Sequence, residues 1–524
     1  MIERIIINNF KQFKKLDVTF NKEKNILIGE NGGGKSTILQ AISLVLSGSF
    51  SHIESLGIIN IFNADSIIDF LKNKSNNELP EVIIELYFFD DYFNKSTEFN
   101  LEGKQNSLRT EKFGLKLHIH PDENYINEIF NSLNDNKWTI FPFEFYKIEF
   151  LTFSGKSYNS YSKPFKFSYS IINTSLIDTN LEMQKRINEI YEDNVESSNH
   201  YIVNHKFREN SEIFLNNLIS NNLLKNDGTY KLAFDNSSED AFKSKMTVKK
   251  DNIDIHNLGK GEKVILSIEN VYNRLSEKIK IILIEEPENH LSYANMLKLI
   301  DIFKEKDIQV FISTHSNMIT SRLGINNCLL LNCGNILPIK NIDSDTVRFF
   351  EKSTNQNLLN FILCNKIILV EGNAEYILLE EFYKQKTGKS TYQDNIQIIS
   401  VDGLSFKRYL NIAKHFPNKK ISVITDNDKD YIKNIANKYI DYSTIENIDI
   451  FSDPDNNNYT FEICIYNSNQ QILKNLTSAK NILKFMLDNK AEFSLRVLEI
   501  LYENSSNFII PEYIEDAIEW VRKN

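Results

Sequence analysis

The sequence has no long hydrophobic run, and none of its apolar stretches approaches the roughly 20 residues that a membrane-spanning helix needs. The first residues, MIERIIINNFKQF, alternate charged and apolar side chains and lack the apolar core of a signal peptide. We therefore expect a protein with no membrane contact and a cytoplasmic location.

Cysteine is also scarce, and basic residues are not in surplus. The four cysteines have neither metal-ligand spacing nor the density of a disulfide scaffold, so we expect them to be reduced and packed. A formal net charge of -10 excludes a broadly basic surface for a polyanion. Any DNA contact must be local, for example at the lysine clusters 243–250 or 414–420, unless these are solvated faces.

What is present is a chain of 524 residues, long enough for more than one hydrophobic core. Short apolar runs at 2–9 and 24–29 predict strands, and the pattern at 36–48 predicts a helix. Further strand-like runs occur at 81–90, 113–120 and 146–153, and a polar helical stretch at about 176–226 is interpreted as an insertion. A linker is expected at about 340–362. After it, strands and helices alternate again, which predicts a second α/β domain, and the tail from about 470 is expected to be helical.

A glycine-rich loop follows the strand predicted at 24–29. The segment GENGGGKST satisfies the G-x-x-x-x-G-K-[ST] pattern and lies between a predicted strand and a predicted helix, which is the context that this motif requires. Its amides and the helix N-terminus would bind a phosphate chain, with Lys35 on the β- and γ-phosphates and Ser36 on Mg²⁺. The nucleotide-binding residues would be Gly29, Asn31, Gly32, Gly33, Gly34, Lys35, Ser36 and Thr37.

A nucleotide site also needs an acid on a neighbouring strand. The run IILIEEP ends four apolar residues on two carboxylates, of which Glu285 would hold Mg²⁺ and Glu286 would polarise the attacking water. The same residues could be an ordinary helix start with a proline in its first turn. The next predicted strand ends in FISTHS, which places His315 to sense the γ-phosphate and favours the catalytic interpretation.

The order of these motifs, with Leu258 to Glu262 (LGKGE) before the acidic strand end, resembles the ABC ATPase family and its DNA-repair branch. In that family a segment of this kind from one subunit covers the ATP of another, so the resemblance implies a homodimer and gives Gly259 and Gly261 a role in nucleotide binding. Gly259 replaces the usual serine and Lys260 a glycine. The segment could instead be a glycine-rich turn that opens a helix.

A second constellation of acids closes three later strands. Glu371 ends IILVEG, Asp402 ends IISVDG, and Asp426 and Asp428 end VITDND. The carboxyl ends of parallel strands meet at one edge of a sheet, and oxygen ligands there suit Mg²⁺ or Mn²⁺. Two such ions could activate water and stabilise the leaving oxygen of a phosphodiester. Taken singly, each acid could be a solvated strand cap.

The segment ILVEGNAEYILLEEF followed by D-x-D resembles the Toprim domain. Joined to an ABC-type ATPase, it is similar to the OLD (overcoming lysogenization defect) family of nucleases. The resemblance implies metal binding by Glu371, Asp426 and Asp428, with Glu375, Asp402 and Glu462 completing the cluster, and it places Lys490 near the scissile phosphate. It further implies a homodimer or higher assembly, a role in defence against phage, and for some relatives a helicase or a reverse transcriptase with its RNA as partner.

The sequence therefore predicts an α/β protein with an ABC-type P-loop ATPase at 1–345, a helical dimerisation insert, and a Toprim nuclease domain at 362–524. We expect a metal-dependent DNA endonuclease controlled by ATP. The alternative is a nucleotide-switched DNA-binding scaffold whose acidic site is inactive or needs a partner.

Overall fold

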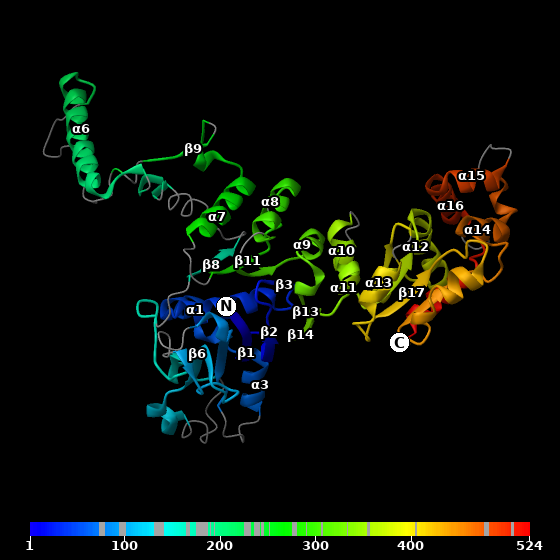
Figure 1. Ribbon diagram of the computed structural model, residues 1–524, viewed down its shortest axis with the longest axis horizontal. Coiled ribbons are helices and arrows are strands. Elements are labelled where there is room, and N and C mark those ends of the chain that lie inside the picture. Colours follow the sequence, from blue (N-terminus) through cyan, green and yellow to red (C-terminus); the bar gives the residue numbers. More distant parts are fainter. Residues whose placement is uncertain are drawn as a thin grey trace. The chain divides into compact units, whose positions relative to one another are not determined.

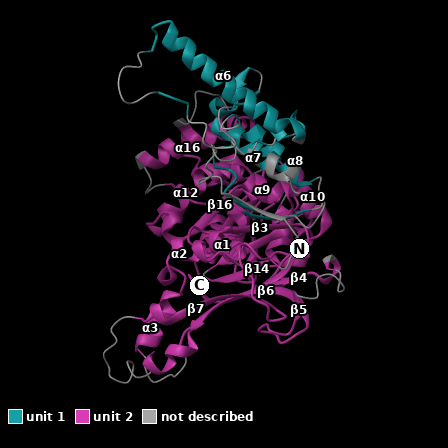
Figure 2. Ribbon diagram, turned by 90° about the vertical axis from the view of Figure 1, so that its left-hand side faces the viewer, with its two compact units in different colours: residues 1, 165–312 teal, residues 2–164, 313–524 magenta. Residues whose placement is uncertain are grey.

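The computed structural model forms two compact units, shown in Figure 2: residues 165–312 with Met1 (unit 1), and residues 2–164 with 313–524 (unit 2). The structure describes residues 1–72, 79–93, 101–129, 141–163, 168–173, 187–188, 190–192, 194–224, 232–234, 242, 246–250, 252–274, 280–289, 291–304, 308–332, 334–353, 357–403, 406–475, 481–504 and 508–523.

Unit 2 begins with an antiparallel sheet in the order β2-β1-β4-β6-β5, with β7 also paired to β6. Its strands are β1 (Ile2–Phe10), β2 (Phe13–Thr19), β4 (Val82–Phe88), β5 (Glu102–Gly103), β6 (Lys112–Pro121) and β7 (Tyr146–Thr152). The apolar runs at 2–9, 81–90, 113–120 and 146–153 were predicted as strands, and these predictions are confirmed. Helix α1 (Lys35–Ser47) packs on β4 and β6 through its apolar face.

The glycine-rich loop connects a buried strand to α1. Strand β3 (Lys24–Gly29) pairs in parallel with β13 (Cys328–Asn332), which pairs antiparallel with β14 (Asn335–Pro338). Short helices complete this part of the unit, namely α2 (Phe50–Leu56), α3 (Ala64–Lys72) and α9 (Asn317–Arg322). The strand, loop and helix expected from the sequence are therefore present in that order (Figure 1).

Unit 1 contains the parallel pair β8 (Ser168–Asn173) and β11 (Lys280–Glu285). Its other elements are α6 (His200–Ser220), the short strands β9 (Lys249–Lys250) and β10 (Ile253–Asp254), α7 (Lys260–Arg274), α8 (Tyr293–Lys304) and β12 (Gln309–Ser313), which ends at the boundary of the unit. Within the insert expected at 176–226, residues 176–186, 189, 193, 225 and 226 lie outside the described residues, and α6 provides one helix of 21 residues.

The C-terminal part of unit 2 is a parallel sheet in the order β16-β15-β17-β18. Its strands are β15 (Lys366–Val370), β16 (Ile396–Ser400), β17 (Lys420–Ile424) and β18 (Ile448–Phe451), and its helices are α12 (Asn373–Thr387), α13 (Phe406–Ala413), α14 (Phe461–Asn469), α15 (Ile482–Asp488), α16 (Lys490–Asn504) and α17 (Glu512–Arg522). The chain passes from β15 to one neighbour, β16, and then to the other, β17. Ligands of open α/β sheets bind at such a switch point, beyond the carboxyl ends of the strands.

The segment 340–362 differs from the linker that we expected. It contains α10 (Ser344–Lys352) and α11 (Leu358–Leu363). The amide of Leu359 donates to the Asn317 side chain at 2.6 Å, and the Asn411 side chain donates to the Asp343 carboxylate at 3.3 Å. These contacts hold the segment against α9 on one side and α13 on the other. Burial of its apolar side chains stabilises the same packing.

The sequence analysis expected reduced, packed cysteines and no membrane-spanning helix. Cys328 and Cys464 are buried, Cys364 is partly buried, and all three are free thiols, while Cys333 lies outside the described residues. No helix in the described ranges is both long and apolar enough to cross a membrane.

Candidate functional site

The glycine-rich loop of unit 2 has a backbone that only glycine fits at its critical points. Gly34, which precedes α1, has a φ of 106°, and a Cβ atom there would lie 2.3 Å from the Gln12 side chain and 2.4 Å from the Phe13 ring. The ammonium group of Lys35 is buried and donates to the carbonyl oxygens of Gly29 at 2.9 Å and Glu30 at 3.0 Å. The loop is thus shaped to present its amides and Lys35 to a phosphate chain.

The remaining loop residues differ in exposure. Asn31, Gly32 and Ser36 are exposed, whereas the Thr37 side chain is buried and donates to Gln12 Oε1 at 3.0 Å. The Gln12 amide in turn donates to the carbonyl of Gly32 at 3.1 Å. Gln12 therefore fixes the loop from outside the motif. Sequence reasoning missed it, because a glutamine between two strands carries no pattern.

The other ATPase residues are divided between the units. In unit 1, β11 ends at Glu285 and is followed by Glu286 at a φ of 45°, with the Asn289 amide donating to Glu286 Oε2 at 2.7 Å. Gly259 precedes α7, and its carbonyl accepts from the amide of Lys263 at 3.0 Å. Gly261 lies in the first turn of α7. The glycine-rich segment is therefore a helix start, which is compatible with either interpretation given above.

His315 belongs to unit 2 and lies two residues beyond the end of β12. It is partly buried, and the next residue, Ser316, caps α9 by accepting from the amide of Ile319. The strand end predicted for this histidine is confirmed. Its role toward a nucleotide stays a prediction.

The acidic residues of the C-terminal sheet converge at the switch point between β15 and β17. Glu371 directly follows β15, Glu375 lies in the first turn of α12, and Asp426 lies two residues beyond β17. The Asp426 carboxylate accepts from the amide of Phe461 at 2.8 Å, and this bond joins it to the start of α14, where Glu462 lies. Residues far apart in the sequence thus form one acidic cluster.

Burial and mutual repulsion change the protonation of this cluster. The pKa of Glu375 is raised to about 7 by burial and then by the neighbouring charges of Glu462 and Glu371. The pKa of Asp426 is raised well above its usual value by burial, Glu375 and Glu371. The pKa of Glu371 is raised by burial and by Asp428. A cation that binds among these carboxyl groups would stabilise their ionised form.

Glu462 and Lys490 form the only ion pair recorded within the described part of this cluster. Glu462 is completely buried, and the Lys490 Nζ atom lies 3.1 Å from its Oε1 atom. Neither oxygen of Glu462 has a well-aligned hydrogen bond to a described residue. Burial lowers the pKa of Lys490, but the Glu462 charge outweighs this and the pKa is raised. Lys490 is half-exposed, so its charge also faces solvent.

Asp428 and Asp402 lie at the rim of the cluster. Asp428 has a φ of 49°, and its amide donates to the carbonyl of Tyr459 at 3.2 Å. Asp402 is exposed with a φ of 50°, and the following amide, that of Gly403, donates to the Glu371 carbonyl at 2.9 Å. Asp402 is therefore beside the main chain of Glu371, but it is not among the charges that raise the pKa of the buried acids.

A buried amide that the sequence analysis missed holds the D-x-D loop. The Asn427 side chain is 1% exposed and donates to the carbonyls of Asp453 at 2.8 Å and Asp455 at 3.0 Å, while its oxygen accepts from the amide of Lys429 at 2.9 Å. Asn427 occupies the variable position of the motif, so the pattern alone gives it no role. It ties the loop that carries Asp426 and Asp428 to the segment after β18.

The donor set of the cluster fits a hard divalent cation. Every group offered is a carboxylate oxygen, and Glu462 keeps a buried carboxylate without well-aligned donors. Among the described residues, no three of these carboxylates bring ligand atoms within 4.8 Å of one another. Metal binding at this site therefore stays a prediction that rests on the donor chemistry.

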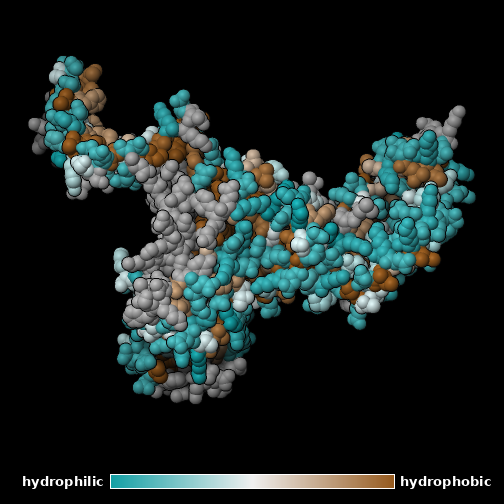
Figure 3. Space-filling model, in the orientation of Figure 1, coloured by the Kyte–Doolittle hydropathy of each residue, from teal (hydrophilic) through white to brown (hydrophobic). Residues whose placement is uncertain are grey.

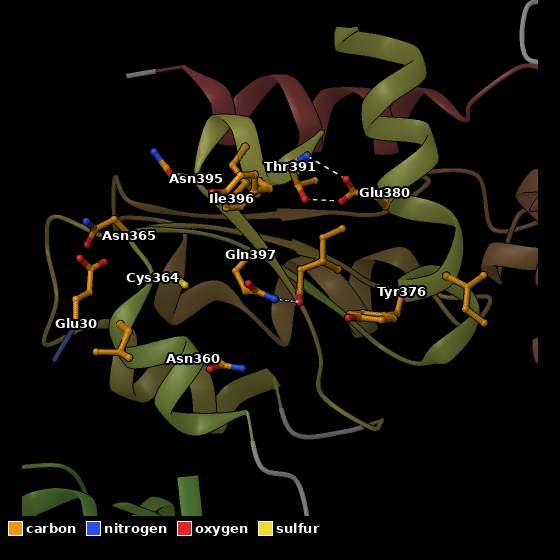
Figure 4. A pocket seen from close by; sticks show the side chains of 14 residues that line it. Glu30, Asn360, Cys364, Asn365, Tyr376, Glu380, Thr391, Asn395, Ile396 and Gln397 are labelled. Atoms are coloured by element: carbon orange, nitrogen blue, oxygen red, sulfur yellow. Dashed lines mark hydrogen bonds between the residues drawn. The ribbon is translucent and has the colours of Figure 1, made fainter. Parts of the chain in front are cut away.

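A separate cavity of about 930 Å³ is lined mostly by residues of the C-terminal part of unit 2 (Figure 4). Tyr376 and Glu380 from α12 line it together with Glu30, which follows Gly29 in the glycine-rich loop. The amide of Thr391 donates to Glu380 at 3.2 Å. None of the predicted metal ligands lines this cavity, so it is distinct from the acidic cluster.

The fold and these residues define the class: a P-loop ATPase domain followed by a Toprim domain. Residues 1–320 match the family of the AAA ATPase domain, and residues 362–428 match the family described as overcoming lysogenization defect protein-like, TOPRIM domain. Because the first match covers 320 of 524 residues, the chain belongs to the AAA ATPase domain family. The expected α/β fold class and the expected pairing with an OLD-like TOPRIM domain are confirmed.

Individual relatives match only short segments. Over 54 residues the chain is 52% identical to the Septu protein PtuA of Bacillus mycoides, which is 9% of this chain and 8% of that protein. Over 46 residues it is 44% identical to the DNA double-strand break repair Rad50 ATPase of Methanopyrus kandleri, 9% and 5% of the two chains. The chain thus spans less than a tenth of the length of either relative.

Among solved structures, the chain is similar to the C-terminal region of the Burkholderia pseudomallei OLD protein, with 19% identity, a TM-score of 0.22 and coverage of 30% of this chain and 98% of that one. It is also similar to the SMC head domain from Thermotoga maritima, with 14% identity, a TM-score of 0.30 and coverage of 65% and 99%.

Proposed function

We propose that this protein is an ATP-regulated, metal-dependent DNA endonuclease whose cleavage site is the acidic cluster at the switch point of the C-terminal sheet. The observation that carries the proposal is the convergence of three carboxyl groups with raised pKa values beside the Glu462–Lys490 ion pair. They are the buried Glu375 and the partly buried Glu371 and Asp426. Desolvation of several carboxyl groups at one sheet edge costs folding free energy, and a scaffold function does not require it.

The ligands of the proposed site are Glu371, Asp426 and Asp428, with Glu375, Glu462 and Asp402 around them. Bound there, Mg²⁺ or Mn²⁺ supplies an activated water and stabilises the leaving oxygen of the phosphodiester. The carboxyl groups of Glu375 and Asp426 give up protons when a cation binds, so metal affinity should rise with pH. The half-exposed Lys490 ammonium would contact a phosphate of the DNA backbone.

The glycine-rich loop and Lys35 would bind ATP, with Glu285 and Ser36 on its Mg²⁺ ion and Glu286 and His315 at the γ-phosphate. Gly259 and Gly261 would cover the nucleotide of a partner copy. Control of cleavage is supported by the cavity in Figure 4, because Glu30 of the loop and Tyr376 and Glu380 of α12 share it, and α12 also carries Glu375. A nucleotide that shifts the loop would then bias the position of α12.

A homodimer or higher assembly is part of this proposal. Figure 3 shows hydrophobic residues, coloured brown, on the surface of helix α6. The helix has a single buried residue, Ser211, and it exposes several large apolar or aromatic side chains. They are Tyr201, Ile202, Ile213 and Phe214. Exposed apolar groups of this kind are typical of an association surface. The proposal places the dimer contact on this insert.

The biological role proposed is cytoplasmic defence against phage DNA, supported by the likeness of residues 362–428 to the OLD-like TOPRIM family. The names of relatives that refer to DNA repair support DNA as the substrate. A helicase, or a reverse transcriptase with its RNA, would be the partner if the purified protein is inactive alone.

The test is cleavage of supercoiled and linear DNA with Mg²⁺ or Mn²⁺, with and without ATP, by wild type, Asp426→Ala and Lys35→Ala. We expect Asp426→Ala to abolish cleavage while ATP hydrolysis continues, and Lys35→Ala to remove the response to ATP. If no metal supports cleavage although ATP is hydrolysed, and cell extract does not restore it, the protein is a nucleotide-switched scaffold and the nuclease proposal is wrong.

A further inference from the structure

A cluster of two histidines and two glutamates lies on the antiparallel sheet of unit 2, outside the ATPase and acidic sites. His118 and His120 are two residues apart on β6, so both side chains lie on the same face of the sheet. Glu149 on β7 is directly opposite His118 in the register, and Glu81 immediately precedes β4. The four residues therefore come from three neighbouring strands or their ends.

The ligand atoms of this cluster are already close together. One atom from each of His118, His120 and Glu149 lies within 4.8 Å of the other two, and no other such group of three occurs in the described ranges. The two imidazole rings are stacked with centroids 4.3 Å apart and planes inclined by 29°. All three side chains are mostly buried but retain an exposed edge, so a small cation could reach them.

The hydrogen bonds of the two rings decide which nitrogens are available. His120 Nδ1 lies 3.0 Å from the carbonyl oxygen of Pro121, which can only accept, so Nδ1 carries the proton. His118 Nε2 lies 2.8 Å from Glu81 Oε2, which as an ionised carboxylate also only accepts. Each neutral ring thus has one nitrogen held by an acceptor and the other with a lone pair. This is the arrangement that orients histidines that bind metals.

The remaining contact of His120 is unfavourable without a positive charge. Its Nε2 atom lies 3.2 Å from Glu149 Oε2, so in the neutral ring a lone pair faces a carboxylate. The other oxygen of Glu149 is bound to the Lys147 ammonium at 2.5 Å, which fixes the carboxylate in this position. Either a proton on Nε2 or a metal cation coordinated by both groups removes this repulsion.

We propose that His118, His120 and Glu149 form a binding site for a transition-metal dication of the Zn²⁺ type, with Glu81 orienting His118. Two imidazoles and a carboxylate suit Zn²⁺ and related ions, whereas the all-carboxylate cluster suits Mg²⁺. The ion links β6 to β7, and through Glu81 to the start of β4. Its role is to stabilise the sheet on which α1 packs, independently of the cleavage reaction.

The test uses the EDTA-stripped full-length protein and Co²⁺ as a spectroscopic probe. Co²⁺ with histidine ligands in four-coordinate geometry absorbs strongly in the visible range, whereas six-coordinate Co²⁺ on carboxylates absorbs weakly, so the two metal sites are distinguished. We expect the strong band of the wild type to saturate at one equivalent of Co²⁺ per chain and to disappear when Zn²⁺ is added. Zn²⁺ affinity is then measured by competition with a chelator.

The variants are His118→Gln, His120→Gln and Glu149→Gln, with His52→Gln on α2 as the matched control. We expect each site variant to lose the strong band and to bind Zn²⁺ weaker by on the order of 100-fold. The control should behave as wild type, and Zn²⁺ should raise the melting temperature of wild type and control only. Far-UV circular dichroism verifies folding.

Two results would overturn the proposal. One is a wild-type protein that shows only the weak band of six-coordinate Co²⁺. The other is a folded His118→Gln/His120→Gln double variant that binds Zn²⁺ as tightly as wild type.

Discussion

Glu375 shows how burial of a single carboxyl group affects both stability and metal binding. Its pKa rises from 4.5 to about 7 in the folded protein, so folding favours the protonated form. The stabilisation is complete below about pH 4.5 and is lost as the pH rises through about 7. The full pKa difference corresponds to on the order of 3 kcal/mol.

We therefore expect Glu375→Gln to raise the melting temperature of the EDTA-treated protein at about pH 8.5 and to change it little at about pH 4. Glutamine keeps the acceptor that the amide of Gly372 uses at 3.1 Å, so the helix start is preserved. Thermal unfolding followed by fluorescence at both pH values measures the effect. Glu381→Gln on the same helix is the control, and equal curves for the two variants would refute the explanation.

Among the described residues, Lys490 forms the ion pair recorded with the acidic cluster, because its ammonium group lies beside the Glu462 carboxylate. Lys490→Met would keep the length of the side chain but leave Glu462 buried without its counter-charge. We expect DNA cleavage to fall by about 100-fold or more, because a positive group beside the reacting phosphate is lost. ATP hydrolysis should be unchanged.

The matched control for this change is Lys484→Met on α15, a lysine that is exposed. Lys490→Arg tests whether charge alone is sufficient, and we expect it to recover part of the cleavage rate. A Lys490→Met protein that cleaves at the wild-type rate would exclude Lys490 from the reaction.

The residues that could be predicted from the sequence are those whose position follows from an element boundary. The strand-end positions of Glu371, Asp426 and Asp428 were predicted because each follows an apolar run that is typical of a buried strand. Gln12 and Asn427 were missed because an amide acts through partners that tertiary structure supplies. The pair His118 and His120 has a readable signal, H-x-H within a predicted strand, which was not used.

At the scale of elements, the loop after β17 is held by its own network rather than by regular structure. Asn427 supplies the amide that satisfies the carbonyls of Asp453 and Asp455. Asn427→Ala leaves these groups without their donor, at a cost of about 1–3 kcal/mol. We expect a lower melting temperature and weaker Mn²⁺ binding, because Asp426 and Asp428 are carried by this loop.

Calorimetric titration with Mn²⁺ and thermal unfolding test this expectation. Asn457→Ala, which changes an exposed asparagine of the facing segment, is the control. Mn²⁺ affinity that is equal in the two variants would show that the loop does not position the ligands.

Several elements that escaped prediction are short. Strand β14 has four residues, and β18 also has four, which is too short for a periodic pattern to be recognised. The helices α10 and α11 were taken for a linker because both are short and polar residues surround them. The five-residue strands β15 and β17 were predicted correctly, since burial on both faces of a parallel sheet requires a continuous apolar run.

At the scale of the whole molecule, the packing within one chain does not explain the stability of α6. A helix of 21 residues with one buried side chain is not stabilised by its own core, and helical stability in proteins derives mainly from packing of an apolar face. Ile213 and Phe214 are 51% and 55% exposed at its C-terminal half. Sequence alone predicted helix here, but the partner of an apolar face is not encoded in any local pattern.

We expect the double change Ile213→Glu/Phe214→Glu to convert a dimer into a monomer, because two buried charges per subunit would face each other across the contact. Sedimentation velocity measures the mass, and ATP hydrolysis per subunit should fall with it if Gly259 of one copy covers the nucleotide of another. Tyr161→Glu, at a 99% exposed aromatic residue in unit 2, should leave both properties unchanged. A dimer that survives the α6 change with full ATP hydrolysis would place the association surface elsewhere, whereas a monomer that still hydrolyses ATP would separate assembly from the ATPase site.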